Sequence, residues 1–520
     1  MPGNISARKV EPSDLIIPFS IALIQLVIQM LLNGNYGYFR DELYYIACSK
    51  HLAFGFVDQP PLSAAVLAVV RWTLGDSLHA IRFLPALAIS ATAILAALMT
   101  HRLGGGNFAT GLASLCVVAA HVLLGQGRYF SMNSFDIFFW ALASYVVIRI
   151  LTGDSPRFWL VFGLVVGLGL LNKYSIGFLC VGIGAGLLLT QHRSQLRSKW
   201  FWLGALLALL LFLPHILWEV KNGFPSLEFM RNASEQKNAP MPLLEFTMGQ
   251  FLQLNYFSAP VWLLGLAYFF FDHRGRELRA LGWTYIVVFA IMVVGNGKVY
   301  YLSPIYPILF AGGAAFLERF IAERSWNWTK PLVVGLIVLG TLIGLPFAIP
   351  ILPIKTFIAY QEMLGMKPRS EERTPVGVLP QGYADEFGWE EMVAVIASAY
   401  HKLTPEEQSK CVIYVRNYGE AGAVDFFGPK YGLPNALCAH NNYWYWGPGE
   451  KTGDVAIILG GSRSLQDNLN DLKRRYSYVE LAATTQIEYC MPYENGRSFF
   501  ICKGMNTTFQ KLWPEERHFI

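Results

Sequence analysis

The stretch LIIPFSIALIQLVIQMLL (residues 15–32) decides the fold, because it runs its whole length without a charged side chain. A helix needs about 20 mostly apolar residues to cross a hydrocarbon core of about 30 Å. Arg8 and Lys9 precede the run, as they would in a signal peptide, but the run continues to Leu32 without a small-residue cleavage site. We therefore predict that residues 15–32 form a retained first transmembrane helix.

Similar apolar stretches recur as far as Pro350, in a chain that is 54% hydrophobic and only 15% charged, which is typical of a membrane protein. The predicted fold class is a polytopic α-helical membrane protein with about eleven transmembrane helices and a C-terminal α/β soluble domain. Asn172, Lys173 and Tyr174 interrupt one nearly continuous apolar stretch, so residues 158–191 form either two spans or one. The predicted spans are 15–32, 80–100, 107–125, 133–151, 158–172, 174–191, 200–218, 251–271, 279–296, 300–318 and 331–350.

Basic residues predict the orientation of these spans. An odd number of spans places the two termini on opposite sides, and cytoplasmic loops carry an excess of Lys and Arg. We therefore expect a cytoplasmic N-terminus, and external positions for residues 33–79, residues 219–250 and the C-terminal domain. The expected location is a bacterial inner membrane with that domain in the periplasm. The residues that mark the cytoplasmic side are Arg8, Lys9, Arg102, Arg157, Arg193, Arg197, Lys199, Arg274, Arg276, Arg279, Arg319, Arg324 and Lys330.

The apolar spans stop before Lys355, which predicts a membrane domain over residues 1–354 and an α/β domain over residues 355–520. Strands are expected at 376–379, 411–415 and 455–459, and helices at 389–400 and 465–475. If this domain faces an oxidising compartment, at least one disulfide is expected among its four cysteines, with the pairing left open. These cysteines are Cys411, Cys438, Cys490 and Cys502.

Chemistry-bearing residues gather in the first external loop. Arg40, Asp41 and Glu42 follow the first span directly, and Asp58 and Gln59 come before two prolines that stiffen the loop. Residues 41–54 are compatible with a short helix on the membrane surface. Paired carboxylates suit general base catalysis on a hydroxyl or amine, and they also suit metal coordination. Alternatively, Arg40 simply neutralises one carboxylate at the level of the lipid headgroups.

The loop and several later motifs resemble membrane glycosyltransferases of the GT-C superfamily, specifically the protein O-mannosyltransferase and aminoarabinose transferase clade (glycosyltransferase family 39-like). The resemblance extends over most of residues 35–315. Its motifs are FRDELYY (39–45), VDQPPL (57–62), GRYFSMN (127–133), NKYS (172–175), WEVKNGFP (218–225) and GKVYYLSP (297–304).

This resemblance implies the transfer of a sugar from a polyprenyl-phosphate donor to a lipid, glycan or protein acceptor at the extracytoplasmic face, usually with inversion at the anomeric carbon. The family has a catalytic carboxylate in the first loop, and Asp41 is the matching position, with Glu42 and Asp58 as further catalytic candidates. Many relatives carry another acidic residue near the start of the fourth span, where this chain has Asn133 and, one helical turn later, Asp136.

A leaving phosphate needs fixed cations. Lys298, Arg128 and Lys173 are candidates for this role, although each could instead extend toward lipid phosphate. The further candidates for substrate binding are Arg40, Gln59, Asn133, Asp136, Tyr300 and Tyr301.

A metal requirement stays open, although a divalent ion is a possible cofactor. His215 and Glu219 are four residues apart and would share one helix face, a spacing that can hold a metal ion but more often reflects a contact at a helix end. They are therefore weak candidates for metal ligands.

Two other classes of function compete with transfer. A transporter of lipid-linked or small-molecule substrates would show repeated halves, and none are visible in the sequence. A catalytically silent scaffold would not need the acidic first loop. The net charge of +5 is spread over many loops without a basic block, which argues against nucleic acid as a partner. Membrane lipids, a lipid-linked donor and its acceptor are the expected partners.

Overall fold

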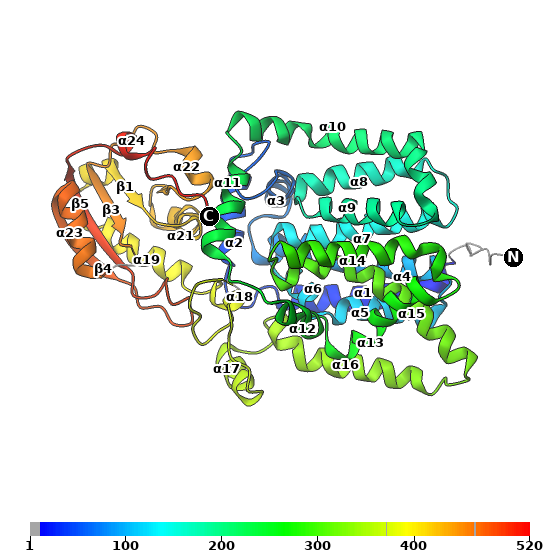
Figure 1. Ribbon diagram of the computed structural model, residues 1–520. Coiled ribbons are helices and arrows are strands. Elements are labelled where there is room, and N and C mark those ends of the chain that lie inside the picture. Colours follow the sequence, from blue (N-terminus) through cyan, green and yellow to red (C-terminus); the bar gives the residue numbers. More distant parts are fainter. Residues whose placement is uncertain (1–10, 371, 462–463) are drawn as a thin grey trace. The chain divides into compact units, whose positions relative to one another are not determined.

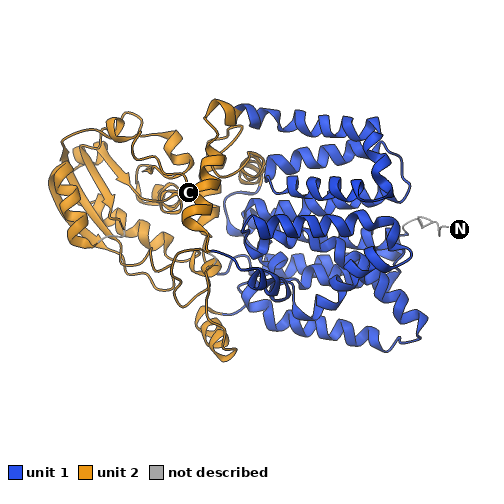
Figure 2. Ribbon diagram, viewed as in Figure 1, with its two compact units in different colours: residues 1–35, 74–217, 240–352 blue, residues 36–73, 218–239, 353–520 orange. Residues whose placement is uncertain are grey.

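The computed structural model describes residues 11–370, 372–461 and 464–520, which fold into helices and one five-stranded sheet (Figure 1). Two compact units are present (Figure 2). Unit 1 comprises residues 1–35, 74–217 and 240–352, and unit 2 comprises residues 36–73, 218–239 and 353–520. The predicted boundary after residue 354 lies close to residue 353, where the chain passes from unit 1 to unit 2 for the last time. Unit 2 additionally takes in two connections that the sequence had assigned to the membrane domain.

Unit 1 is built from apolar helices. Within the part of the chain that the structure describes, seven helices are long and apolar enough to cross a membrane, or nine if each of two bent helix pairs counts as one span. The spans that consist of one helix are α1 (Pro12–Leu32), α4 (Leu78–Arg102), α7 (Met132–Leu151), α10 (Lys199–Lys221) and α16 (Thr329–Ala348). Each of the other two joins a short 3-10 helix to an α-helix. The span Gly275–Val294 contains α14 (Arg279–Val294), and the span Val299–Glu323 contains η5 (Val299–Ile305) and α15 (Tyr306–Glu323).

The remaining predicted spans correspond to bent or short helices. The bent pairs are α9 (Ile176–Leu188) with η1 (Gln191–Arg197), and α12 (Leu243–Gln253) with the segment Tyr256–Phe271 that contains α13 (Ala259–Phe271). The helices α5 (Asn107–Ala119) and α8 (Phe158–Asn172) are shorter than a full span. Since α8 ends at Asn172 and α9 begins at Ile176, residues 158–191 form two helices, not one.

Small residues let these helices pack closely. A Cβ atom added to Gly313 on α15 would lie 1.8 Å from the carbonyl oxygen of Val261 on α13. Such contacts are typical of helix interfaces in lipid, where association depends on close approach of the backbones. In contrast, large apolar side chains such as Leu23, Trp202 and Leu342 are exposed.

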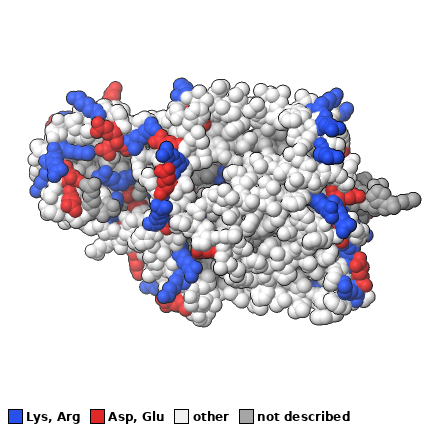
Figure 3. All heavy atoms as spheres, in the orientation of Figure 1, with Lys and Arg blue, Asp and Glu red and all other residues white. Residues whose placement is uncertain are grey.

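The surface of unit 1 has the charge distribution of a membrane-spanning bundle. On the face seen in Figure 3 the middle of the unit is almost entirely uncharged, and Lys, Arg, Asp and Glu gather at its end near the N-terminus. We conclude that the chain is an integral membrane protein of the predicted fold class. Arg8 and Lys9, which support the predicted orientation, lie outside the described residues.

The sheet of unit 2 has the order β2-β1-β3-β5-β4. Strand β1 pairs in parallel with β2 and β3, whereas β5 pairs antiparallel with β3 and β4. Strands β1 and β3 are buried along their whole length because helices and loops cover both faces of the sheet. The strands are β1 (Cys411–Tyr414), β2 (Ala436–Leu437), β3 (Val455–Leu459), β4 (Tyr476–Thr484) and β5 (Ser498–Met505).

The expected α/β layering is confirmed, with one strand placed wrongly. The predicted helices at 389–400 and 465–475 are α19 (Trp389–Tyr400) and α23 (Leu465–Arg475). Residues 376–379 form irregular backbone that ends in a bend, instead of a strand. This apolar run lies close to Pro375 and Pro380, and proline cannot donate to a sheet ladder.

The expected disulfide is wrong, because all four cysteines of unit 2 are free. Strand β3 separates Cys411 on β1 from Cys502 on β5. Two strand spacings amount to about 9–10 Å. A disulfide needs Cα atoms within about 7 Å of each other.

Helix α2 (Arg40–Lys50) forms where a helix was predicted, but it does not lie on a membrane surface. Its residues from Glu42 to Ser49 are buried, and Leu43, Tyr44, Ala47 and Cys48 share a core with α19 and with α21 (Tyr418–Phe427). Because the helix is buried around most of its circumference, little of it is left to contact lipid. The first loop therefore belongs to the core of the α/β unit.

Candidate functional site

Asp41 occupies the first turn of α2, where its carboxylate is partly exposed. The hydroxyl of Tyr418 donates a hydrogen bond to Asp41 Oδ1 over 3.0 Å. Tyr418 is the first residue of α21, whose N-cap Asn417 accepts hydrogen bonds from the backbone N–H groups of Gly419 and Glu420. The carboxylate of the first loop is thus oriented by a side chain of the α/β domain, almost 380 residues further along the chain.

The two neighbours of Asp41 have separate contacts. The guanidinium of Arg40 lies over the rings of Tyr418 and Tyr493, 4.8 Å and 5.6 Å from their centroids, and its Nη1 donates to Tyr493 Oη at 2.5 Å. Glu42 is fully buried, and its Oε2 accepts the backbone N–H of Phe39 at 2.9 Å, which caps α2. Arg40 therefore does not neutralise Asp41 in a simple ion pair, and Glu42 holds the start of the helix.

Asp58 lies beside this group. Tyr44 donates to Asp58 Oδ1 at 3.0 Å, and the ring of Tyr44 lies 4.7 Å from that of Tyr418. Burial raises the pKa of Asp58 to about 6, although the hydrogen bond from Tyr44 lowers it, and the charge of Asp41 raises it further. Asp58 therefore changes its charge close to the physiological range, as catalytic carboxylates often do.

The loop that carries Asp58 is anchored to the α/β domain. The backbone N–H of Val57 donates to Asn442 Oδ1 at 2.7 Å, and the N–H of Asn442 donates to the Tyr44 hydroxyl at 3.3 Å. Gln59 is buried, and its backbone carbonyl oxygen accepts the backbone N–H of Phe56 at 3.0 Å. These contacts give Gln59 a structural role in shaping the loop.

Unit 1 assembles a second group of predicted residues. Lys173, in the short connection between α8 and α9, donates to Asn133 Oδ1 at 2.7 Å and lies 3.7 Å from Asp136 Oδ2. Ser175 donates to the Asp136 carboxylate at 2.6 Å. Asp136 is buried and fully engaged, so the ion pair ties α7 to the connection between α8 and α9.

Aromatic rings border this ion pair. The Lys173 ammonium lies 5.1 Å from the ring centroid of Tyr301 and 6.0 Å from that of Tyr300. Both tyrosines belong to η5, which directly follows Lys298. Five predicted residues, namely Asn133, Asp136, Lys173, Tyr300 and Tyr301, therefore meet in one place.

The other two predicted cations lie in connections between helices. Arg128 is buried in the connection between α6 (His121–Gln126) and α7, with its guanidinium 5.3 Å from the ring centroid of Tyr129. Lys298 is partly buried and has an extended backbone just before η5. Each cation comes directly before a helix or a tight turn of unit 1.

The weak metal candidates make other contacts. His215 Nε2 lies 2.7 Å from the Tyr174 hydroxyl, and Glu219 Oε1 accepts a hydrogen bond from Ser226 Oγ at 2.6 Å. Within the described ranges 11–370, 372–461 and 464–520, no group of three or more His, Cys, Asp or Glu side chains is placed to hold a metal ion. His215 and Glu219 thus have other partners, and no reaction step is assigned to a metal ion.

Sequence reasoning missed the residues of the α/β domain that contact the first loop. These include Tyr418, Tyr493 and Asp385, whose carbonyl oxygen accepts the N–H of Arg40 at 3.0 Å. Tyr418 follows a strand that the sequence did predict, and functional side chains in α/β sheets often follow the carboxyl ends of strands. The position of Tyr418 after a predicted strand was therefore the signal in the sequence that could have identified it.

The bundle of apolar helices and the appended α/β sheet define the class of protein, a polytopic membrane protein with a GT-C fold. ArnT from Cupriavidus metallidurans bound to undecaprenyl phosphate has a similar structure, with a TM-score of 0.59 and 14% identity over 95% of this chain and 98% of that chain. Residues 58–218 match the family model Dolichyl-phosphate-mannose-protein mannosyltransferase. Residues 58–218 thus resemble that family and the fold is similar to that of ArnT, which agrees with the resemblance inferred from the sequence.

Two curated relatives match part of the chain. Lipid A galacturonosyltransferase RgtD of Rhizobium johnstonii is 26% identical over 243 residues, which are 46% of this chain and 50% of that protein. Undecaprenyl phosphate-alpha-4-amino-4-deoxy-L-arabinose arabinosyl transferase 2 of Pseudomonas fluorescens is 23% identical over 362 residues, 64% of this chain and 61% of that protein. The aligned part of the chain thus spans only 50% and 61% of the lengths of these relatives.

Proposed function

We propose that the protein is a glycosyltransferase that moves a sugar from a polyprenyl-phosphate donor to an acceptor at the extracytoplasmic face of a bacterial inner membrane. The observation that carries this proposal is the Asp41 carboxylate, which is partly exposed at the start of α2 and held at one oxygen by Tyr418. In a chain with the GT-C fold, a carboxylate that is both oriented and accessible suits a general base. The comparisons lend no support to the transporter alternative.

Asp41 is the proposed base of a single displacement. Its free carboxylate oxygen takes the proton of an acceptor hydroxyl or amine while that group attacks the anomeric carbon. The bond between this carbon and the phosphate oxygen breaks, and its electron pair leaves with the polyprenyl phosphate. Attack opposite the leaving group inverts the anomeric carbon.

Tyr418 acts through Asp41 as a positioning residue. A hydrogen bond to one carboxylate oxygen fixes the rotation of the side chain, so the other oxygen points in one direction. Because misplacement by about 1 Å can cost about a hundredfold in rate, such a contact matters for the reaction. Asp58, held in turn by Tyr44, is the second carboxylate of this group.

Lys298, Arg128 and Lys173 are the proposed cations for the donor phosphate. A fixed positive charge stabilises the negative charge that develops on a leaving phosphate. Lys173 already faces Asp136, so part of its charge is balanced within the protein. We propose all three as cations for the donor phosphate, with Tyr300 and Tyr301 as apolar walls beside the sugar or the carrier.

The names of the relatives suggest which substrates to try first. One relative is a lipid A galacturonosyltransferase, and the other is named for an undecaprenyl phosphate-linked aminoarabinose. We propose a pentosyl or hexosyl donor on undecaprenyl phosphate and a lipid A-type acceptor, with glycan or protein acceptors as the next candidates.

Incubation of the purified protein in lipid vesicles with a panel of undecaprenyl-phosphate sugars tests this function. The panel contains aminoarabinosyl, galacturonosyl and mannosyl donors, each with and without lipid A. The proposal predicts release of undecaprenyl phosphate from one donor only when an acceptor is present. Failure of every donor to react, combined with donor movement across the vesicle membrane, would instead identify a transporter.

A further inference from the structure

The sheet of unit 2 contains a point at which its connections diverge. From β1 the chain passes to β2 on one side, whereas from β3 it passes through α23 to β4 and β5 on the other side. In open α/β sheets, ligands bind outside the carboxyl ends of the parallel strands at such a point. The ends of β1 and β3 are therefore the place in this domain where a ligand site is expected.

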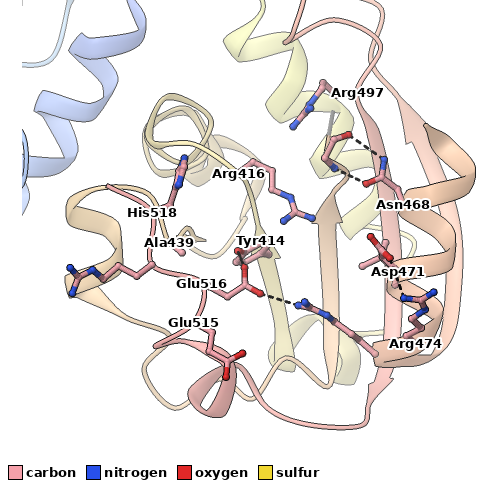
Figure 4. A pocket seen from close by; sticks show the side chains of 14 residues that line it. Tyr414, Arg416, Ala439, Asn468, Asp471, Arg474, Arg497, Glu515, Glu516 and His518 are labelled. Carbon is pink, nitrogen blue, oxygen red and sulfur yellow. Dashed lines mark hydrogen bonds and ion pairs between the residues drawn. The ribbon is translucent and has the colours of Figure 1, made fainter. Parts of the chain in front are cut away.

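A pocket of about 850 Å³ lies there (Figure 4). Tyr414 ends β1 and Arg416 follows it, Ala439 comes after β2, and Gly461 comes after β3. The volume falls within the range of small-molecule sites, about 300–1,000 Å³, and exceeds what a single inorganic anion needs. Few of the lining residues are apolar, which favours a polar ligand.

Arginine dominates the charge of the pocket. Among the residues that the structure describes, five arginines line it against three carboxylates, an excess of two positive charges when His518 is neutral. The arginines are Arg416, Arg474, Arg475, Arg497 and Arg517, and the acidic residues are Asp471, Glu515 and Glu516.

Arg416 is anchored by a backbone carbonyl at the strand ends that border the pocket. Its Nε donates to the carbonyl oxygen of Leu459 at 3.0 Å, which joins the ends of β1 and β3. Among the residues that the structure describes, none forms an ion pair with Arg416, whereas Arg475 Nη1 lies 3.0 Å from Glu516 Oε1. Figure 4 shows the Arg416 side chain extending among Tyr414, Asn468 and Asp471.

Arg497 supplies a second, largely buried cation. Its side chain is 11% exposed, and its Nη2 lies 3.6 Å from Glu420 Oε1. Burial raises the pKa of Glu420 and the nearby Glu494 carboxyl raises it further, whereas the Arg497 guanidinium lowers it. The buried Nε of Arg497 has no hydrogen-bond partner in the described part of the chain.

We propose that this pocket binds the phosphate monoester of a phosphorylated saccharide. Guanidinium groups bind phosphate oxygens through paired hydrogen bonds, and a buried donor without a partner is stabilised when a ligand accepts its hydrogen. The space beyond the phosphate is large enough for a sugar ring. Asp41, Asp58 and Tyr418 are not among the residues that line the pocket, so the pocket is distinct from the group that holds the proposed base.

Calorimetric titration of the full-length, detergent-purified protein with glucose 1-phosphate tests this proposal, with inorganic phosphate and glucose as comparison ligands. Glucose 1-phosphate should bind saturably and more tightly than phosphate, and glucose should not bind. Arg416→Gln and Arg497→Gln should each weaken binding about ten- to a hundredfold, the loss expected for a charge-assisted hydrogen bond. Lys430→Gln removes an exposed cation outside the pocket and should change affinity less than twofold.

Each arm of the titration has a defined meaning. Absence of saturable glucose 1-phosphate binding to the wild-type protein would overturn the proposal, as would unchanged binding in both arginine variants at unchanged melting temperature. Equal affinity for phosphate and glucose 1-phosphate would reduce the pocket to a free-phosphate site and overturn the saccharide assignment. Because binding is measured and not transfer, none of these outcomes depends on the proposed glycosyltransferase activity.

Discussion

The hydrogen bond from Tyr418 to Asp41 is a single contact whose removal can be matched by a control. Tyr418→Phe keeps the ring beside Arg40 and deletes only the hydroxyl. We expect kcat to fall about tenfold with little change in the donor KM, because a carboxylate that can rotate is less often aligned with the acceptor.

Tyr443→Phe is the matched control, because it deletes the same kind of hydrogen bond, to Asp425 Oδ2 at 2.8 Å. It should lower the melting temperature without changing kcat. If Tyr418→Phe behaves in the same way as this control, Tyr418 has only a structural role.

Asp385 gives the α/β unit a predictable response to pH. Burial raises the pKa of Asp385 to about 7, Arg40 lowers it, and Asp41 and Glu494 raise it further. An unfolded Asp titrates near 3.9, so between about pH 4 and pH 7 the folded state binds the proton more tightly. The contribution of Asp385 to stability is therefore greatest at low pH and is lost as the pH rises through about 7.

Asp385→Asn removes this titration while preserving the shape of the side chain. Thermal unfolding of the variant and the wild-type protein is measured at pH 5, 7 and 8.5. The melting temperature of the variant minus that of the wild-type protein should increase as the pH rises. A difference that stays constant over this range would mean that the carboxyl of Asp385 does not titrate there.

The candidate residues were predictable from the sequence only where a motif was local. Asp41 and Asp58 could be chosen because the whole loop signature lies within 24 residues, from 39 to 62. The partner Tyr418 could not, because the contact joins residues 377 positions apart and the tyrosine has no motif of its own. In the same way, sequence spacing could not reveal that Glu42 is buried as a helix cap.

At the scale of elements, the packing of α2 against α21 determines whether Tyr418 reaches Asp41. A Cβ atom added to Gly422 on α21 would lie 2.8 Å from the backbone of Leu43 on α2, so the two helices approach more closely than a side chain allows. Gly422→Ala should push α2 away, lower the stability by about 1–3 kcal/mol and reduce turnover.

Gly184→Ala on α9 is the control for this helix contact, since nothing lies within 4 Å of an added Cβ there. Removing a helical glycine in open space should be neutral or slightly stabilising, because alanine favours the helix. Equal melting temperatures and equal turnover of the two variants would contradict the close packing of α2 and α21.

The elements themselves were largely predictable from composition. Each of the eleven apolar stretches contains helix, because long apolar runs without charge have few alternatives in lipid. Their lengths and bends were not predictable. The angle of 116° between α9 and η1 depends on tertiary packing that hydropathy does not record.

At the scale of the whole molecule, orientation in the membrane is still a prediction that rests on loop charge. New cysteines at exposed positions can test it, because the native cysteines are buried or partly buried. Lys410→Cys lies in the α/β unit, and Arg193→Cys lies in a predicted cytoplasmic loop. A membrane-impermeant maleimide should label Lys410→Cys in cells with a permeabilised outer membrane, but Arg193→Cys only after lysis. The reverse pattern would invert the topology.

The central claim is that Asp41 is the base of a sugar transfer, and one comparison tests it most directly. Asp41→Asn, Glu42→Gln and Asp58→Asn are reconstituted in lipid vesicles beside the wild-type protein, and release of polyprenyl phosphate is measured with the donor and acceptor that support turnover. We predict that Asp41→Asn loses about 10²–10⁴-fold in rate, the usual contribution of a general base. Near wild-type turnover by Asp41→Asn, together with loss of activity in either of the other two variants, would contradict the assignment.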